Sequence, residues 1–279
     1  MVAVVFGAAG SVGSHVAAGL AARDIRVRAT SRRPESGRLP AGTEVVAADL
    51  ERPETLPAAL AGAETVFLYA KPEGIDGFVA AAEAAGVRHV ALLSSGGVVS
   101  PRAEENPIAR LHRAVEVALE GSGLAWTFIR GGMFATNARW WWTDPIRNGD
   151  AVRLPYPEAQ TAPVHEKDLA AIAVSALTEP GHAGQAYLVN GPESLTLREQ
   201  VGHIGRAIGR EIAIEAVPED EARADLARTM PPAAVDAIMY VWKAGVDAPA
   251  PVSTTVRDVT GQPPHSFAEW AGDHADDFR

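Results

Sequence analysis

Three glycines near the start of the chain are spaced to bind a ligand that contains phosphate. Gly7, Gly10 and Gly13 follow the apolar run Val2–Phe6 and lead into Ser14–Ala22, an Ala-rich segment that favours helix. In a strand–turn–helix unit, the first glycine permits a tight turn and the second lets the backbone approach a pyrophosphate. The third lets the helix pack closely on the sheet. This context predicts a dinucleotide site, although a glycine-rich turn without a ligand has the same pattern. The expected contacts are Gly7, Ala9, Gly10, Ser11, Val12 and Gly13.

The residues after the second predicted strand, Ile25–Thr30, indicate which dinucleotide would bind. Sites for NAD commonly carry an acidic residue about 20 residues after the glycines, where it binds the ribose 2′-hydroxyl. In this chain Ser31, Arg32 and Arg33 occupy that place. Guanidinium groups pair with phosphate through two hydrogen bonds. The sequence therefore predicts NADP(H) in preference to NAD(H), with Arg32 as the main contact; a solvated arginine pair in a loop is the alternative.

Apolar runs alternate with helix-forming segments along most of the chain, which indicates a parallel sheet covered on both faces. The further predicted strands are Thr43–Ala48, Thr65–Ala70, His89–Ser95, Leu124–Arg130, Thr161–His165 and Gln185–Val189. The main predicted helices between them are Pro53–Leu60, Ile75–Ala85, Pro107–Glu120 and Glu166–Leu177. We predict an α/β fold, a Rossmann doubly wound parallel sheet with a smaller, mostly helical C-terminal substrate lobe. The expected domains are residues 1–150, with segments near 160–190 returning to them, and residues 151–279.

The residues that follow each strand are further candidates for the cofactor site, because ligands of such sheets bind at the carboxyl ends of the strands. These candidates are Asp49, Leu50, Tyr69, Ala70, Lys71, Ser94 and Met133. Asp49 alternatively caps the predicted helix that follows it.

The alternation of strands and helices stops after the sixth strand, where three tryptophans are consecutive. Trp140, Trp141 and Trp142 cannot all face one core on a helix or a strand. At least one is expected at a pocket mouth, a lid or a subunit contact, while core packing accounts for one or two. The predicted substrate pocket contains Phe134, Asn137, Trp141 and His165. For His165, a capping or packing role is the alternative.

Composition excludes several classes of function. The 279 residues carry a formal net charge of −10, whereas nucleic-acid binding needs clustered Lys and Arg. The absence of cysteine excludes disulfides and thiolate chemistry, and no histidine spacing matches a metal site. No apolar run reaches the length of a membrane span, and no secretory signal pattern precedes the first strand. A cytoplasmic protein that binds a small molecule is expected, and a homodimer is left open.

Taken together, these segments resemble the NmrA-like branch of the atypical short-chain dehydrogenase/reductase superfamily. The resemblance runs from Val2 to Ile208 through GAAGSVG, Arg32, Asp49–Leu50, AAEAAGVRHVALLSS, Glu116, SGLAWTFIRGGMF with Asn137, and APVHEKDLA. It implies a Rossmann domain that binds NAD(P) and serves either as a reductase or as a redox sensor. The family usually has proline where this chain has Gly131, in the wall beside the nicotinamide.

One departure from the superfamily concerns its chemistry. Most of its dehydrogenases use Tyr-x-x-x-Lys, in which the Tyr exchanges a proton with the substrate oxygen. Spacing to Glu116 places Ile108 and His112 where that pair would stand. His112 is a candidate to bind the ribose or to transfer a proton, and a surface or cofactor-supporting histidine is the alternative. Ser95 stands near the superfamily's catalytic serine, although a strand-end serine can instead bond the backbone.

Three functions agree with this sequence. The first is an NADPH-dependent reductase of a small aromatic or conjugated molecule such as a quinone, because such an acceptor needs less help from a protein acid. The second is a redox sensor in which NADP(H) binding changes an interaction with a protein partner. The third is a tailoring enzyme for a natural product.

Overall fold

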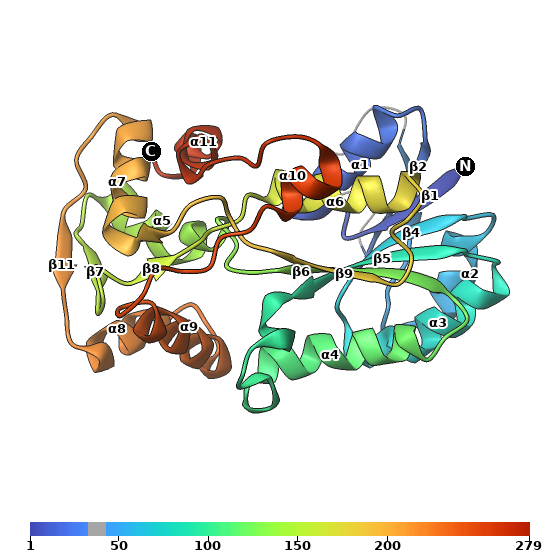
Figure 1. Cartoon of the computed structure of the whole chain (residues 1–279), viewed down its shortest axis with the longest axis horizontal. Helices are drawn as coiled ribbons and strands as arrows, with labels where there is room; N and C mark the ends of the chain where they lie inside the picture. The colour runs from blue at the N-terminus through green and yellow to red at the C-terminus, as the bar shows by residue number, and fades with distance from the viewer. Residues whose placement is uncertain (33–42) are drawn as a thin grey trace. The chain divides into compact units, whose positions relative to one another are not determined.

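Seven parallel strands form one sheet, and all but the last of them lie within residues 1–131 (Figure 1). This computed structural model describes residues 1–32 and 43–279. The strands lie in the order β3-β2-β1-β4-β5-β6-β9, which extends the Rossmann order by one strand at one edge. Their bounds are β1 Val2–Phe6, β2 Arg26–Ser31, β3 Glu44–Ala47, β4 Thr65–Tyr69, β5 His89–Ser95, β6 Ala125–Gly131 and β9 Gln185–Val189. The predicted fold class is confirmed.

Helices cover both faces of this sheet (Figure 1). One face carries α1 (Ser11–Ala21), α6 (Glu166–Thr178) and α10 (Thr255–Thr260), and the other carries α2 (Leu56–Leu60), α3 (Ile75–Ala84) and α4 (Pro107–Glu120). Because both faces are buried, β1 and β4 are continuous apolar runs rather than alternating ones. On the α2–α4 face, Phe6 of β1 meets Phe78 of α3 edge to face, with ring centroids 5.6 Å apart.

The chain divides into two compact units whose segments are interleaved. The first unit is Met1–Gly131, Glu166–Val189 and Thr255–Gln262, and the second is Gly132–His165, Asn190–Thr254 and Pro263–Arg279. In the second unit β7 (Val152–Leu154) pairs with β11 (Ile214–Ala216), and β8 (Gln160–Thr161) pairs with β10 (Leu195–Thr196). Its main helices are α5 (Asn137–Asn148), α7 (Leu197–Ile208), α8 (Glu219–Leu226), α9 (Pro232–Ala244) and α11 (Phe267–Asp273).

Aromatic side chains form the core of the second unit. Trp142, Trp242 and Trp270 are almost fully buried there, and Trp141 is 8% exposed. Trp140, by contrast, is 72% exposed. A helix turns about 100° per residue, so three consecutive side chains cannot share one face.

Two predicted elements are shorter or less regular than the sequence suggests. The strand predicted at Thr161–His165 is reduced to β8 and a single bridge between Phe134 and Val164. Pro163 lacks the N–H that a continuing ladder would need. The helix predicted at Pro53–Leu60 begins as a 3₁₀ turn, Pro53–Thr55, before α2.

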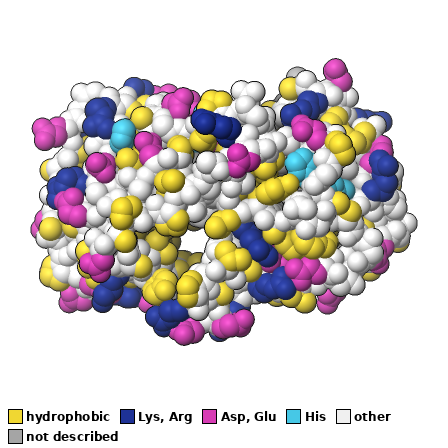
Figure 2. All heavy atoms as spheres, viewed as in Figure 1, with side chains coloured by type: hydrophobic (Ala, Val, Ile, Leu, Met, Phe, Trp, Pro, Cys, Tyr) yellow, Lys and Arg dark blue, Asp and Glu magenta, His cyan; other side chains and the backbone are white. Residues whose placement is uncertain are grey.

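Charges of both signs are interspersed over the face of the molecule seen in Figure 2. Within residues 1–32 and 43–279, no helix is both long and apolar enough to cross a bilayer. In the same residues, no group of three or more potential ligands could hold a metal ion.

Candidate functional site

The glycine-rich turn between β1 and α1 has no space for larger side chains. Gly7 has φ +70°, a conformation that favours glycine, and its carbonyl accepts a hydrogen bond from the Gly10 N–H at 2.8 Å. A Cβ atom on Gly13 would lie 2.2 Å from the Gly7 oxygen, so α1 can pack this closely only with glycine there. The geometry matches the roles that the sequence assigns to the first and third glycines.

The first turn of α1 is open to a ligand. Gly10 is the N-cap, and no side chain caps the helix. Ala9, Gly10 and Ser11 are exposed, whereas the Val12 side chain is 5% exposed and packs inward. Val12 therefore has only its backbone to offer. Free N–H groups and the positive end of the helix dipole suit a pyrophosphate, so the residues present fit a dinucleotide.

Tyr69, the last residue of β4, lies against the glycine turn. A Cβ atom on Gly7 would lie 3.1 Å from Tyr69 Cδ1, so the ring covers this glycine. Burial raises the pKa of Tyr69, and the positive charge of Arg32 opposes this effect. Arg32 is exposed and Ser31 is half-buried at the end of β2. Arg33 lies outside the described residues.

Three other cofactor candidates have structural roles of their own. Asp49 Oδ1 accepts a hydrogen bond from the Glu51 N–H at 3.1 Å, which forms a local turn rather than a cap on α2. Leu50 is 3% exposed and belongs to the core below the sheet, and Ala70 packs against the same core. A cofactor could therefore contact Leu50 only through its backbone.

Lys71 is neutralised by its neighbours. Its Nζ atom lies 3.1 Å from Glu51 Oε1 and 3.2 Å from Glu73 Oε2. Hydrogen bonds to these carboxylates raise the pKa of Lys71. Within residues 1–32 and 43–279 Arg32 forms no ion pair, so it remains the predicted contact for a 2′-phosphate.

A buried carboxylate connects the ends of β5 and β6, which sequence analysis did not foresee. Glu116 of α4 is fully buried and accepts the Ser94 hydroxyl at 2.7 Å. Arg130 of β6 donates to both of its oxygens, at 2.9 and 2.8 Å, and Arg113 donates at 3.2 Å. Burial alone would raise the pKa of Glu116, but these hydrogen bonds hold it below its usual value. Ser94 thus uses its hydroxyl proton within the protein.

Ser95 and His112, the predicted catalytic residues, lie in the same unit. Ser95 Oγ accepts a hydrogen bond from the Gly97 N–H at 3.1 Å and caps a 3₁₀ turn, Gly96–Val99. His112 Nδ1 lies 2.8 Å from the Ile108 carbonyl, which can only accept, so Nδ1 carries the proton. The lone pair of Nε2 in the neutral ring can then accept a proton or a hydrogen bond. Burial lowers the pKa of His112, and the bond to Ile108 and the charge of Glu116 offset this only in part.

The remaining candidates belong to the second unit. Val164 holds the segment after β6 through hydrogen bonds with Met133 and Ala135, at 2.8 and 2.9 Å. Half-buried Asn137 donates to the Met133 sulfur at 3.2 Å, and Phe134 is half-buried beside them. His165 and Trp141 are placed differently. His165 is 1% exposed and lies 3.2 Å from Asp273 Oδ2, and Trp141 is in the aromatic core.

Comparison with known proteins identifies relatives over the full chain. A family model described as NAD(P)H-binding matches residues 7–180, more than half of the chain. The chain is 39% identical to a (4-alkanoyl-5-oxo-2,5-dihydrofuran-3-yl)methyl phosphate reductase of Streptomyces griseus subsp. griseus, over 99% of this chain and 98% of the relative. It is 34% identical to an NAD(P)H azoreductase of Xenophilus azovorans, with the same two coverages.

Solved structures share the fold. An NADPH-dependent quinone oxidoreductase from Escherichia coli superposes with a TM-score of 0.79 at 25% identity, covering 98% of this chain and 99% of that one. The triphenylmethane reductase of Citrobacter sp., solved with NADP(H), gives 0.78 at 22% identity over 99% and 100% of the two chains. The second likeness concerns the fold alone.

Proposed function

Because the chain belongs to the NAD(P)H-binding family, we propose that it uses NADPH to reduce a small aromatic or conjugated acceptor such as a quinone. The resemblance to NmrA-like, atypical short-chain dehydrogenases/reductases is confirmed, and the chain is an NAD(P)H-dependent oxidoreductase. The proposal adds the preference for NADPH and the nature of the acceptor.

The proposal depends on two observations taken together: the nucleotide-binding turn is intact, and the usual proton donor of the superfamily is missing. The turn at Gly7–Gly13 fits a pyrophosphate, while His112 stands where the superfamily has lysine. When bound, the cofactor would supply hydride. The chain would orient both reactants and exclude water, and His112 Nε2 would accept a hydrogen bond or proton near the ribose. An acceptor that delocalises the incoming charge needs no strong acid from the protein.

The names of the relatives support a conjugated acceptor. A 4-alkanoyl-5-oxo-2,5-dihydrofuran carries a ring double bond that is conjugated with two carbonyl groups on the same carbon, and azo and quinone groups are conjugated as well. We propose that hydride goes to one atom of such a system and that the proton comes from solvent, with His112 as the candidate relay. The test follows NADPH absorbance with a panel of quinones, azo compounds and acyl-dihydrofuranones. Tight NADPH binding without turnover of any of them would contradict the proposal and favour a redox sensor.

Arg32→Ala is expected to weaken NADPH binding by about 1–3 kcal/mol and to leave NADH binding nearly unchanged, because only NADPH carries the 2′-phosphate. Calorimetric titration with each cofactor measures this difference. The control is Arg88→Ala, which removes the same charge from an exposed side chain just before β5. An equal loss for both cofactors in Arg32→Ala would show that this residue does not read the 2′-phosphate.

His112→Ala is expected to lower turnover by roughly 100-fold if the imidazole handles a proton, with cofactor affinity nearly intact. Because burial lowers the pKa of His112, the ring is neutral at pH 7 and becomes protonated only below the usual histidine value of about 6.5. The stability due to the neutral ring is therefore full above that pH and declines below it. Reduction of the acceptor consumes a proton, so proton transfer from His112 needs the protonated ring, and turnover is expected to fall as pH rises through its pKa. A pH–rate profile should lose this decline in the variant. A parallel loss of cofactor affinity would instead assign His112 to ribose binding.

A further inference from the structure

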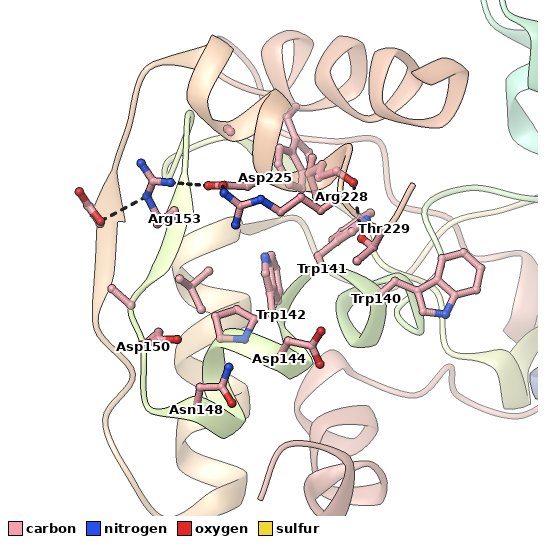
Figure 3. A pocket seen from close by; sticks show the side chains of 17 residues that line it. Trp140, Trp141, Trp142, Asp144, Asn148, Asp150, Arg153, Asp225, Arg228 and Thr229 are labelled. Atoms are coloured by element: carbon pink, nitrogen blue, oxygen red, sulfur yellow. Dashed lines mark hydrogen bonds and ion pairs between the residues drawn. The ribbon is translucent and has the colours of Figure 1, made fainter. Parts of the chain in front are cut away.

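A cavity of about 530 Å³ lies entirely within the second unit (Figure 3). Its walls come from α5, β7, β11, α8 and α9, and from the segment that follows α8. Sites for small molecules commonly have about this volume, roughly 300–1,000 Å³. Of the predicted substrate residues Phe134, Asn137, Trp141 and His165, only Trp141 lines it. The cavity therefore shares one residue with that group and is otherwise separate from it.

Three indole rings form the apolar wall of the cavity. Trp141 packs edge to face against Trp242, with centroids 5.2 Å apart and planes at 83°, and against Trp142 at 5.7 Å. The indole N–H groups of Trp141 and Trp242 are buried and have no hydrogen-bond partner in the described part of the chain. Buried donors are nearly always paired in native proteins. Because both N–H groups are covered, an acceptor atom on a ligand would remove this deficit only after the covering side chains shift.

The charged groups of the cavity leave a negative excess. Arg153 pairs with Asp225 at 2.5 Å and with Glu215 at 3.4 Å, and Figure 3 shows this arrangement at one side of the cavity. Arg228 also pairs with Asp225, at 3.3 Å. Both guanidinium groups are thus neutralised.

Two further carboxylates are not compensated. Asp144 and Asp150 line the cavity, are exposed, and form no ion pair within residues 1–32 and 43–279. Asp144 lies below Trp142 in Figure 3, on the side away from Arg153. Their charges favour a cation at this side, beside the indole rings.

We propose that this cavity binds a small aromatic molecule that carries a positive charge and a hydrogen-bond acceptor. The ring would pack among the tryptophans, and the cation would lie between an indole face and the two free carboxylates. The acceptor would take the N–H group of Trp141 or Trp242. This inference goes beyond the proposed reduction, because every contributing residue belongs to the second unit and the binding needs no cofactor.

The test uses three probes of nearly equal size and different charge. Naphthylmethylammonium, naphthylacetamide and naphthylacetate are titrated calorimetrically into the full chain without NADPH. The ammonium probe is expected to bind at least about tenfold more tightly than naphthylacetate, with the amide between them. Equal affinities, or preference for the carboxylate, would overturn the proposal.

Variants of exposed residues test the charge without threatening the fold. Asp144→Asn with Asp150→Asn should weaken the ammonium probe by about fivefold to tenfold, since exposed ion pairs contribute modestly. The amide probe should bind as before. The matched control is Asp220→Asn with Asp247→Asn, which changes the net charge equally at exposed positions outside the cavity. An equal effect of both pairs would mean that net charge, and not this site, attracts the probe.

The indole contribution is tested by Trp141→Phe, which keeps an aromatic ring and removes one unpaired N–H. The amide probe, whose carbonyl can accept that hydrogen bond, should lose at least about fivefold in affinity. Trp126→Phe, in β6 of the first unit, is the control for a Trp-to-Phe change. Unchanged amide affinity in folded Trp141→Phe would reject the assigned donor.

Discussion

Gly13→Ala is expected to destabilise the protein by about 3 kcal/mol and to abolish NADPH binding. The added Cβ would stand 2.2 Å from the Gly7 oxygen and 2.8 Å from its carbonyl carbon, so the backbone of the turn must move. Overpacking of this kind costs about 1–3 kcal/mol where side chains can adjust, and here the obstacle is main chain. Urea unfolding and calorimetric titration measure the two effects.

Substitutions at two other glycines distinguish an effect on NADPH binding from an effect on stability. Gly10→Ala brings its Cβ to 3.2 Å from the Gly7 oxygen, a contact that a small shift relieves. It should cost less than about 1 kcal/mol of stability, yet block the approach of a pyrophosphate. Gly272→Ala, in α11 with open space around it, should be neutral or stabilising by up to about 1 kcal/mol. Unchanged NADPH affinity in Gly10→Ala would contradict the placement of the cofactor at this turn.

Glu116→Ala is expected to cost about 3–5 kcal/mol of stability, because it leaves Arg130 and Ser94 without their buried partner. The same carboxylate makes stability depend on pH. Its pKa is lowered in the folded state, so its contribution is complete above the unfolded value of about 4.3 and is lost as pH falls through the lower folded value. Unfolding by urea at several pH values measures both effects.

The control is a double variant that replaces both members of the Glu116–Arg130 ion pair. Glu116→Leu combined with Arg130→Met exchanges the ion pair for apolar groups of similar length, and should recover much of the loss. Thermal unfolding of the double variant, compared with Glu116→Ala, decides the question. A loss below about 1 kcal/mol in Glu116→Ala would mean that the pair is not a principal support of the β5 and β6 ends.

The sheet could be predicted because burial on both faces leaves a direct mark on sequence. Runs such as Val2–Phe6 and His89–Ser95 have no polar alternation, and glycines or charged residues bound them. The prediction of a strand at 161–165 was wrong beyond Thr161. It rested on apolar character, which does not take account of the N–H group that Pro163 lacks.

The side-chain partners of the site were less predictable. Ser94 and Glu116 are 22 residues apart, and only the packing of α4 on β5 brings the hydroxyl and carboxylate together. Lys71 was predicted to contact the cofactor, but its ammonium group is paired with Glu51 and Glu73. Backbone roles, as at Gly7, follow from residue type, whereas these roles depend on contacts that residue type does not specify.

In the tryptophan triplet, Trp140–Trp142, one feature could be predicted from the sequence and another could not. Helical geometry required one ring to point away from the core, and Trp140 does so. The cavity beside Trp141 and Trp142 depends on α8 and α9, which follow more than seventy residues later in sequence, and the triplet gave no sign of them.

Interleaving of the two units has a consequence for biosynthesis. On a ribosome, β6 is complete at Gly131, but its neighbour β9 arrives only with Gln185–Val189, and α10 only with Thr255–Thr260. Until then the β6 edge has unpaired main-chain groups, the feature by which nascent sheets associate wrongly. The first unit can therefore be completed only after most of the polypeptide has been synthesised. An open reading frame truncated at Gly131 would encode a sheet whose β6 edge stays unpaired.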